Sequence, residues 1–193
     1  TAIGSFAGNS NQGQYSVAIG RQAGQTTQGT QSVAIGSQAG QTTQGQNSVA
    51  IGFYAGTSSQ GVQSVAIGSQ AGQTTQGLQS VAIGYQAGKT TQNQYSVAIG
   101  YSAGSSNQSI SSVAIGASAG YTSQGQNAVA IGASAGHNSQ ANNSIVINAT
   151  GSTLDNTTAN TFVVKPIRTV NSVTGLYQLY YDPATGEVVY YQP

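Results

Sequence analysis

A sixteen-residue unit repeats without insertion from the start of the chain to residue 148. The glycine that ends the segment SVAIG at Gly20 recurs every sixteen residues up to Gly132, and Asn148 occupies the next place. Helical repeats need a longer unit and coiled coils need heptads, so neither architecture fits this period. An unbroken short period with glycine at fixed places predicts an all-β parallel solenoid in which each repeat forms one coil.

Each unit, numbered from the serine of SVAIG, starts with an alternation of large and small residues. Positions two and four are Val and Ile, as in Val33 and Ile35, and they alternate with Ser32 and Ala34. This period of two places Val and Ile on one face of a strand and the small residues on the other. We expect Val and Ile to point into the coil, and we expect the small Ala/Ser face to be the surface against which other chains pack.

The rest of the unit predicts turns and a second strand. Position thirteen is Gln in every unit, and stacked amides suit a ladder in which each donates to the next. Position fourteen is usually glycine, as in Gly45, and we expect a turn with positive φ there. Its substitutes are Asn93, Ser109 and Ala141. We expect the short second strand within the segment QTTQ.

Composition narrows the function classes. Charged residues make up only 4% of the chain, and the four basic residues do not cluster, whereas nucleic-acid binding needs clustered Lys and Arg. No apolar run approaches the ~20 residues of a membrane-spanning helix. Cysteine is absent, so no disulfide framework or thiolate metal site is expected. The sequence therefore predicts neither a nucleic-acid partner nor insertion into a membrane.

Energetics favour an assembly of several chains. Burying a Val or Ile side chain contributes roughly 1.5–3 kcal/mol, whereas ordering each residue of the backbone costs roughly 1–2 kcal/mol. Two large apolar side chains in a coil of sixteen residues offset only part of that cost. We therefore expect several rods to pack around a shared axis.

The repeats resemble the head repeats of YadA-like trimeric autotransporter adhesins. The resemblance rests on SVAIG followed by AG in each unit, and it extends over residues 1–148. It implies a left-handed parallel β-roll, a homotrimer with the SVAIG strand near its axis, and an extracellular location. The family's unit is usually shorter than sixteen residues, so the longer GQTTQGQ part is expected to bulge outward.

The end of the chain does not follow the sixteen-residue repeat. Residues 149–160 form a polar junction, and residues 161–193 are predicted to form a β-hairpin cap that covers the last coil. Pro166 favours a strand end or an edge strand, and the segment from Asp182 to Gly186 predicts a type I turn with glycine in the left-handed region. Tyr180, Tyr181, Tyr190 and Tyr191 flank this turn.

This tail has a resemblance of its own. NTFVVKPIR and LYYDPATGEVVYY are similar to the segment that precedes an endosialidase-type intramolecular chaperone in phage tail fibres and large-virus fibres. The resemblance implies a trimeric fibre on a virion or cell surface, from which the chaperone is removed after assembly.

Reactive residues are sparse, so we expect no enzyme, no metal site and no cofactor. The single histidine, His137, sits at a variable outward position, and Asp155, Asp182 and Glu187 are the only acids. The repeats contain no carboxylate for a Ser-His-Asp triad, and glycosidases generally need two facing carboxylates. A polysaccharide-degrading fibre is therefore the least favoured function.

Five aromatic residues are candidate contacts for a host receptor or a glycan. Phe53, Tyr54, Tyr85, Tyr101 and Tyr121 stand at variable positions among Gln, Asn and Ser. Such rings can stack on sugars, and they can equally pack between neighbouring chains. A structural surface fibre that attaches to a host is the leading function.

An ice-binding solenoid is the alternative function. Paired threonines such as Thr26 and Thr27 recur in several units, and stacked threonines on a flat face can order water. Adjacent residues of a strand point to opposite faces, which argues against this alternative.

Overall fold

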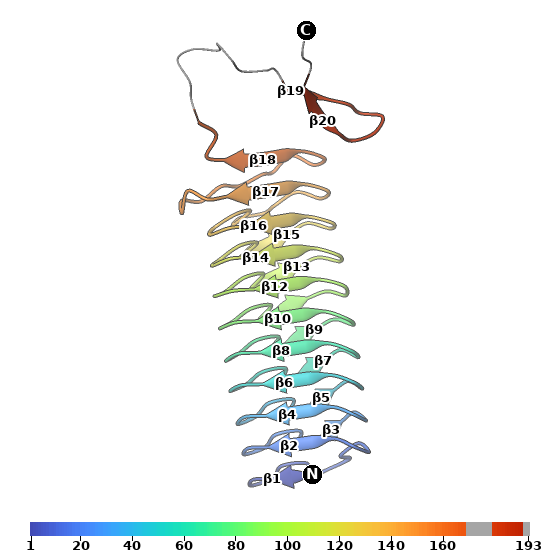
Figure 1. The fold of residues 1–193 in the computed structure, drawn as a ribbon. Coiled ribbons are helices and arrows are strands. Elements are labelled where there is room, and N and C mark those ends of the chain that lie inside the picture. Colours follow the sequence, from blue (N-terminus) through green and yellow to red (C-terminus); the bar gives the residue numbers. More distant parts are fainter. Residues whose placement is uncertain (169–178, 191–193) are drawn as a thin grey trace.

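The computed structural model describes residues 1–168 and 179–190, and these residues form a parallel β-solenoid followed by a hairpin. Figure 1 shows the coils stacked as a straight rod. One wall is an eleven-stranded sheet. Its strands are β1 (Ala2–Ile3), β2 (Val17–Ile19), β4 (Val33–Ile35), β6 (Val49–Ile51), β8 (Val65–Ile67), β10 (Val81–Ile83), β12 (Val97–Ile99), β14 (Val113–Ile115), β16 (Val129–Ile131), β17 (Ile145–Asn148) and β18 (Phe162–Lys165). The predicted fold class is confirmed.

The second wall is a seven-stranded sheet built from the QTTQ segments, as predicted. It contains β3 (Thr27–Gln28), β5 (Thr43–Gln44), β7 (Ser59–Gln60), β9 (Thr75–Gln76), β11 (Thr91–Gln92), β13 (Ser106–Gln108) and β15 (Thr122–Gln124). Neighbouring strands pair in parallel, and Val33 lies beside Val49 while Thr43 lies beside Ser59. Because each residue pairs with the one sixteen positions later, equivalent side chains form continuous columns along the rod.

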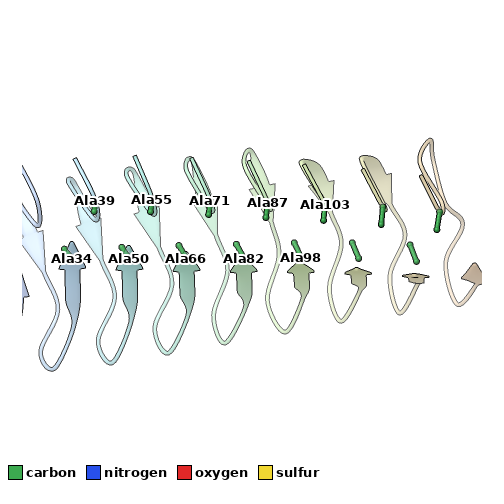
Figure 2. Packing of buried hydrophobic residues seen from close by; sticks show 14 of the residues in the cluster. Ala34, Ala39, Ala50, Ala55, Ala66, Ala71, Ala82, Ala87, Ala98 and Ala103 are labelled. Atoms are coloured by element: carbon green, nitrogen blue, oxygen red, sulfur yellow. The ribbon is translucent and has the colours of Figure 1, made fainter. Parts of the chain in front are cut away.

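The interior of the coil is lined by small residues, which corrects the expectation about Val and Ile. Ala34 and Ala39 are fully buried, and their columns face each other across the coil in Figure 2. Ser32 is fully buried as well, whereas Val33 and Ile35 are only half-buried. The predicted alternation is therefore confirmed, but the predicted orientation is wrong: Ala and Ser point into the coil, and Val and Ile point outward.

Interior space explains this choice of face. The Gln44 side chain crosses the coil, and its Nε2 donates to the carbonyl oxygen of Val33 at 2.7 Å. A methyl group built on Gly40 would meet Gln44 Oε1 at only 2.8 Å. A coil too narrow for that methyl group has no room for Val or Ile, so these larger side chains point outward.

Most side-chain hydrogen bonds of the buried glutamines connect the two walls of one coil, and few connect one coil to the next. Nε2 of each buried Gln from Gln28 to Gln140 donates to a carbonyl oxygen of the facing strand. Direct amide-to-amide bonds join only Gln108 to Gln124, at 3.2 Å, and Gln124 to Gln140, at 3.3 Å. The predicted amide ladder is thus present as a column, but most of its hydrogen bonds run across the coil.

The glycine at position fourteen has a reason other than the predicted one. Gly45 does not have positive φ; Asn47, two residues later, does, at 55°. A Cβ on Gly45 would lie 2.5 Å from the backbone carbon of Gly61 in the next coil. The close approach of two backbones therefore favours glycine here.

The last coil is irregular and contains one extra residue. Ile145 pairs with Phe162, an offset of seventeen residues instead of sixteen. Between them, Leu154 bridges Ala135 and extends the buried core. The sheet thus continues through the predicted polar junction to β18, which is an edge strand and ends directly before Pro166, as predicted for that proline.

A hairpin follows, formed by β19 (Leu179–Tyr181) and β20 (Val188–Tyr190), which pair antiparallel. Gly186 has φ of 76°, which confirms the predicted left-handed glycine of the turn. Residues 169–178 and 191–193, including Tyr191, lie outside the described residues. The predicted cap at 161–193 is therefore described only in part.

Candidate functional site

An apolar face, formed by the outward Val and Ile side chains of the first wall, extends along the rod without cover in the single chain. These side chains come from β2, β4, β6, β8, β10, β12, β14, β16 and β17, two from each strand. They remain half-buried or exposed in the single chain, with Ile115 and Ile131 exposed by 37% and 38%. The predicted packing surface was the small face, which the structure places inside the coil. The apolar face is the outer surface of the same strands.

Each strand of this face is followed by a tight turn. In the turn after β4, the Ala39 N–H donates to the Gly36 carbonyl oxygen at 3.3 Å. The two central residues occupy positions six and seven and point away from the core; we call the column they form the trailing edge of the apolar face. Its second residue has positive φ, as in Gln38 at 61°.

Four of the five predicted aromatic contacts lie on the trailing edge. Phe53, Tyr85 and Tyr101 share position six, and Tyr54 follows Phe53. The rings of Tyr85 and Tyr101, in successive coils, stack with centroids 5.3 Å apart, and Phe53 meets Tyr54 edge-on at 4.2 Å. The structure therefore groups these four residues along one edge of the apolar face.

Tyr121 is set apart from this group, at position ten. Its ring stacks on His137 of the next coil, with centroids 5.0 Å apart. His137 Nδ1 lies 3.0 Å from Asn138 Oδ1. The histidine that was expected at an outward position is half-buried in this stack.

A similar turn precedes each strand, and sequence reasoning missed the side chains that it carries. In the turn before β6, Ser48 Oγ donates to the Gly45 carbonyl oxygen at 2.6 Å. The central residues, at positions fifteen and sixteen, form what we call the leading edge. The exposed apolar residues of this edge are Tyr15, Val62, Leu78, Tyr95 and Ile110. Their recurrence at two fixed positions was the signal available in the sequence.

The second wall presents hydroxyl groups to solvent. Thr42 and Thr43 are both exposed, which contradicts the expectation that adjacent threonines point to opposite faces. The strand β5 begins only at Thr43, so Thr42 lies in the turn before it and does not follow the strand alternation. We call the columns at positions eleven and twelve the hydroxyl face.

The hydroxyl face changes character in the last coils. Position twelve has positive φ at Asn107, Ser123 and Ser139, whereas Thr43 at the same position does not. These three residues and Asn142 line a shallow polar groove. Ser123 and Ser139, which line this groove, lie two residues after Tyr121 and His137 in the sequence.

The described acids belong to separate elements. Asp155 accepts hydrogen bonds from the Asn138 N–H at 2.8 Å and from Asn138 Nδ2 at 3.2 Å, so it binds the open end of the second wall. Hydrogen bonds from the Ala184 N–H and the Thr185 hydroxyl lower the pKa of Asp182 below its usual value of 3.8. Within residues 1–168 and 179–190, no three His, Cys, Asp or Glu side chains gather as metal ligands. Within the same described residues, the structure contains no helix long and apolar enough to cross a membrane.

Comparison with known families identifies the coil. Residues 12–39 and 44–71 match two copies of the YadA head domain repeat. These two segments are YadA head repeats. Each match begins at the Gln of position thirteen and ends at the buried Ala of position eight, so each spans two SVAIG strands.

The coils beyond residue 71 keep the residues that are buried in the matched coils. Position three is Ala through Ala130, and position thirteen is Gln through Gln140. The structural role of each position therefore continues beyond the matched residues. No curated protein and no solved structure gives a significant match to this chain.

Proposed function

We propose that this chain forms the rod of a homotrimeric, adhesin-like fibre on a virion or cell surface. The observation that carries the proposal is the apolar face, which runs along the whole rod and which one chain leaves uncovered. Each coil adds a Val and an Ile to this face, and removing their remaining apolar area from water stabilises an assembly in proportion to length. Large exposed apolar patches mark surfaces that bind other molecules.

The YadA head repeats support three copies, since YadA-type adhesin domains are trimeric extracellular fibres. A cyclic trimer places three apolar faces around one axis and closes the assembly without leaving an open contact. The near absence of charge suits this arrangement, because long parallel faces meet without desolvating ionic groups.

Sedimentation velocity tests the trimer. The chain is expected to sediment with three times its monomer mass. The variant V65S/I67S/V81S/I83S, which makes two strands of the apolar face polar, is expected to dissociate at least tenfold more readily. The control T74S/T75S alters the hydroxyl face beside the same coils and is expected to leave the mass unchanged. A monomeric parent chain at micromolar concentration contradicts the proposal.

The finer part of the proposal is attachment to a host glycan through the side of the rod that faces away from the apolar face. The polar groove of Asn107, Ser123 and Ser139, with Tyr121 nearby in sequence, combines hydroxyl and amide groups with an aromatic ring. Sugars bind to such combinations through hydrogen bonds and ring stacking. Phe53, Tyr54, Tyr85 and Tyr101 are the alternative contacts that the sequence predicts.

A glycan array probed with the trimeric protein tests attachment. We expect retention on a subset of glycans, and we expect the variant Y121A to reduce it while Y85A leaves it unchanged. Loss of retention with Y85A alone moves the contact to the trailing edge. If no glycan is retained, the rod is a spacer only.

We propose a structural and binding role rather than catalysis. Asp155 is engaged with Asn138, and Asp182 with its own turn, so these two carboxylates have structural partners. The resemblance of the tail to viral fibre segments supports placement on a virion. Labelling intact particles and cells with an antibody against the rod distinguishes the two locations.

The hydroxyl face supports one competing function, binding to ice. Thr27 pairs with Thr43, and Thr75 pairs with Thr91, so exposed and half-buried threonines form a regular column. The column is interrupted by Ser59 and ends at Asn107, which makes it short. A thermal hysteresis assay decides the matter: clear activity that T43A/T75A abolishes would rank ice binding above attachment.

A further inference from the structure

The apolar face cannot by itself determine how far one protomer is displaced along the rod relative to the next. From β2 to β16 every coil presents the same Val and Ile at the same place, and Val65, Val81 and Val97 lie in one column. Sliding a neighbour by one coil therefore replaces each contact with an identical one. Only residues that differ from coil to coil, beside this face, can set the axial register.

Such residues lie on the trailing and leading edges. Both edges are built from turns of similar geometry, in which the second central residue has positive φ, as in Gln38 and Asn47. Position six and both leading-edge positions are exposed or half-buried in every coil, whereas position seven is half-buried in most coils and buried at Ser102. The core therefore leaves room for different side chains at most of these positions.

Bulky side chains (aromatic, Val, Leu or Ile) occupy both edges in the same coils. We count nine coils, residues 1–15 and the eight units that follow them. Four coils carry bulky residues on both edges: Phe6 with Tyr15, Phe53 and Tyr54 with Val62, Tyr85 with Tyr95, and Tyr101 with Ile110. The four coils at residues 16–31, 32–47, 112–127 and 128–143 carry none on either edge. Only the coil at residues 64–79 breaks the match, because Leu78 has no bulky counterpart.

Contacts within one chain do not account for this match. The two edges lie at opposite ends of the strand, and its five residues alone span roughly 13 Å or more at ~3.3 Å per residue. The stacking of Tyr85 on Tyr101 joins residues of one edge only. A contact between the edges therefore requires a second chain.

We propose that the trailing edge of one protomer packs against the leading edge of the next, and that this contact holds the three rods in axial register. The inference rests on the homotrimer proposed above. Around a cyclic axis, each protomer meets its neighbour through two different surfaces, and the two ends of its strands are those surfaces. The aromatic column of one chain then lies beside the aliphatic and Tyr column of the next.

The heights of the two columns agree with this contact. The chain rises ~4.8 Å per coil, so the nine residues from position six to position fifteen raise it by about half a coil. Each trailing-edge side chain in a trimer without displacement thus lies between two leading-edge side chains. If the neighbour slips so that each coil meets the coil two units later, Phe6 and Tyr101 face only polar turns.

Cysteine pairs test the contact, because the chain has no cysteine of its own. Ser69 lies on the trailing edge, and we combine S69C with V62C or with L78C, the leading-edge positions just below and just above it in height. The matched controls combine S69C with T30C or with I110C, which are displaced by ~10 Å or more along the axis. All these residues lie in turns, and circular dichroism checks that each variant keeps the parent fold.

Oxidation, and separately a short bismaleimide, are applied to each variant and followed by non-reducing electrophoresis. Covalent dimers and trimers are expected for S69C/V62C and S69C/L78C, at a yield at least fivefold above both controls. Sedimentation of the same samples separates the two proposals. A trimer that yields no cross-link, or equal yields with the controls, overturns the edge contact and leaves the fibre standing, whereas a monomer overturns the fibre itself.

Discussion

Some single residues inside the coil are required for their small size as well as for their backbone conformation. Gly72 has φ of 52°, and a methyl group on it would lie 2.7 Å from Oε1 of Gln76. Gln76 in turn donates to the Val65 carbonyl oxygen at 2.7 Å and holds the two walls together. The glycine thus serves a left-handed turn and leaves room for the buried amide.

Replacing Gly72 with Ala is expected to destabilise the fold by about 2–5 kcal/mol, because a left-handed Ala costs roughly 1–2 kcal/mol and displacing a buried hydrogen-bonded amide costs about 1–3 kcal/mol more. The control is G151A, since Gly151 has φ of 75° with nothing within 4 Å of the added methyl group. Chemical denaturation measures both variants. Equal losses would mean that the interior tolerates the methyl group.

At the scale of elements, the hairpin is defined by its turn. The Asp182 N–H donates to the Glu187 carbonyl oxygen at 2.9 Å, and the Asp182 carboxylate accepts from the Ala184 N–H at 2.8 Å. These bonds favour the ionised carboxylate, which is why its pKa is lowered. The turn residues of the sequence were sufficient to predict this element.

The lowered pKa of Asp182 predicts the pH dependence of the hairpin. A folded-state pKa below the unfolded value of 3.8 contributes stability above that pH, and the contribution is lost as the pH falls through the folded value. The Ala184 amide chemical shift, followed by NMR, is therefore expected to titrate with a midpoint below 3.8. In D182N the titration should disappear, and a midpoint above 3.8 in the parent chain would contradict the hydrogen bond.

At the scale of the whole molecule, the rod must protect its open end. Leu154 covers the last alanines, and Asn148 Nδ2 donates to the Ala133 and Ser152 carbonyl oxygens at 2.7 and 2.6 Å. Unpaired strand edges otherwise template the addition of further chains. The segment predicted as a polar junction thus belongs structurally to the closing coil.

Removing residues 149–193 is expected to expose β17 as an unprotected edge and to cause end-to-end association. Light scattering should report a weight-average mass several times that of the parent assembly. The matched truncation at residue 168 keeps the closing coil and β18, and its mass should equal the parent value. Identical masses for both truncations would show that the closing coil does not protect the end.

The sequence by itself determined the period, the two strands of each coil and the turns. All of these follow from local rules, namely alternation of two, fixed glycines and a constant spacing. It also located Phe53, Tyr85 and Tyr101 as residues that vary where the core does not. It did not identify Val62 or Leu78, because only the stacked coils show which turn positions lie beside the apolar face.

Only the tertiary structure decided which face of the strand lies inside. Alternation defines two faces, Val33 with Ile35 and Ser32 with Ala34, and is silent about which one closes the coil. That choice depends on the width left between the two walls after Gln44 crosses it, and Ala34 and Ala39 fill that width completely. Val and Ile consequently face outward, where a partner rod rather than the coil itself can bury them.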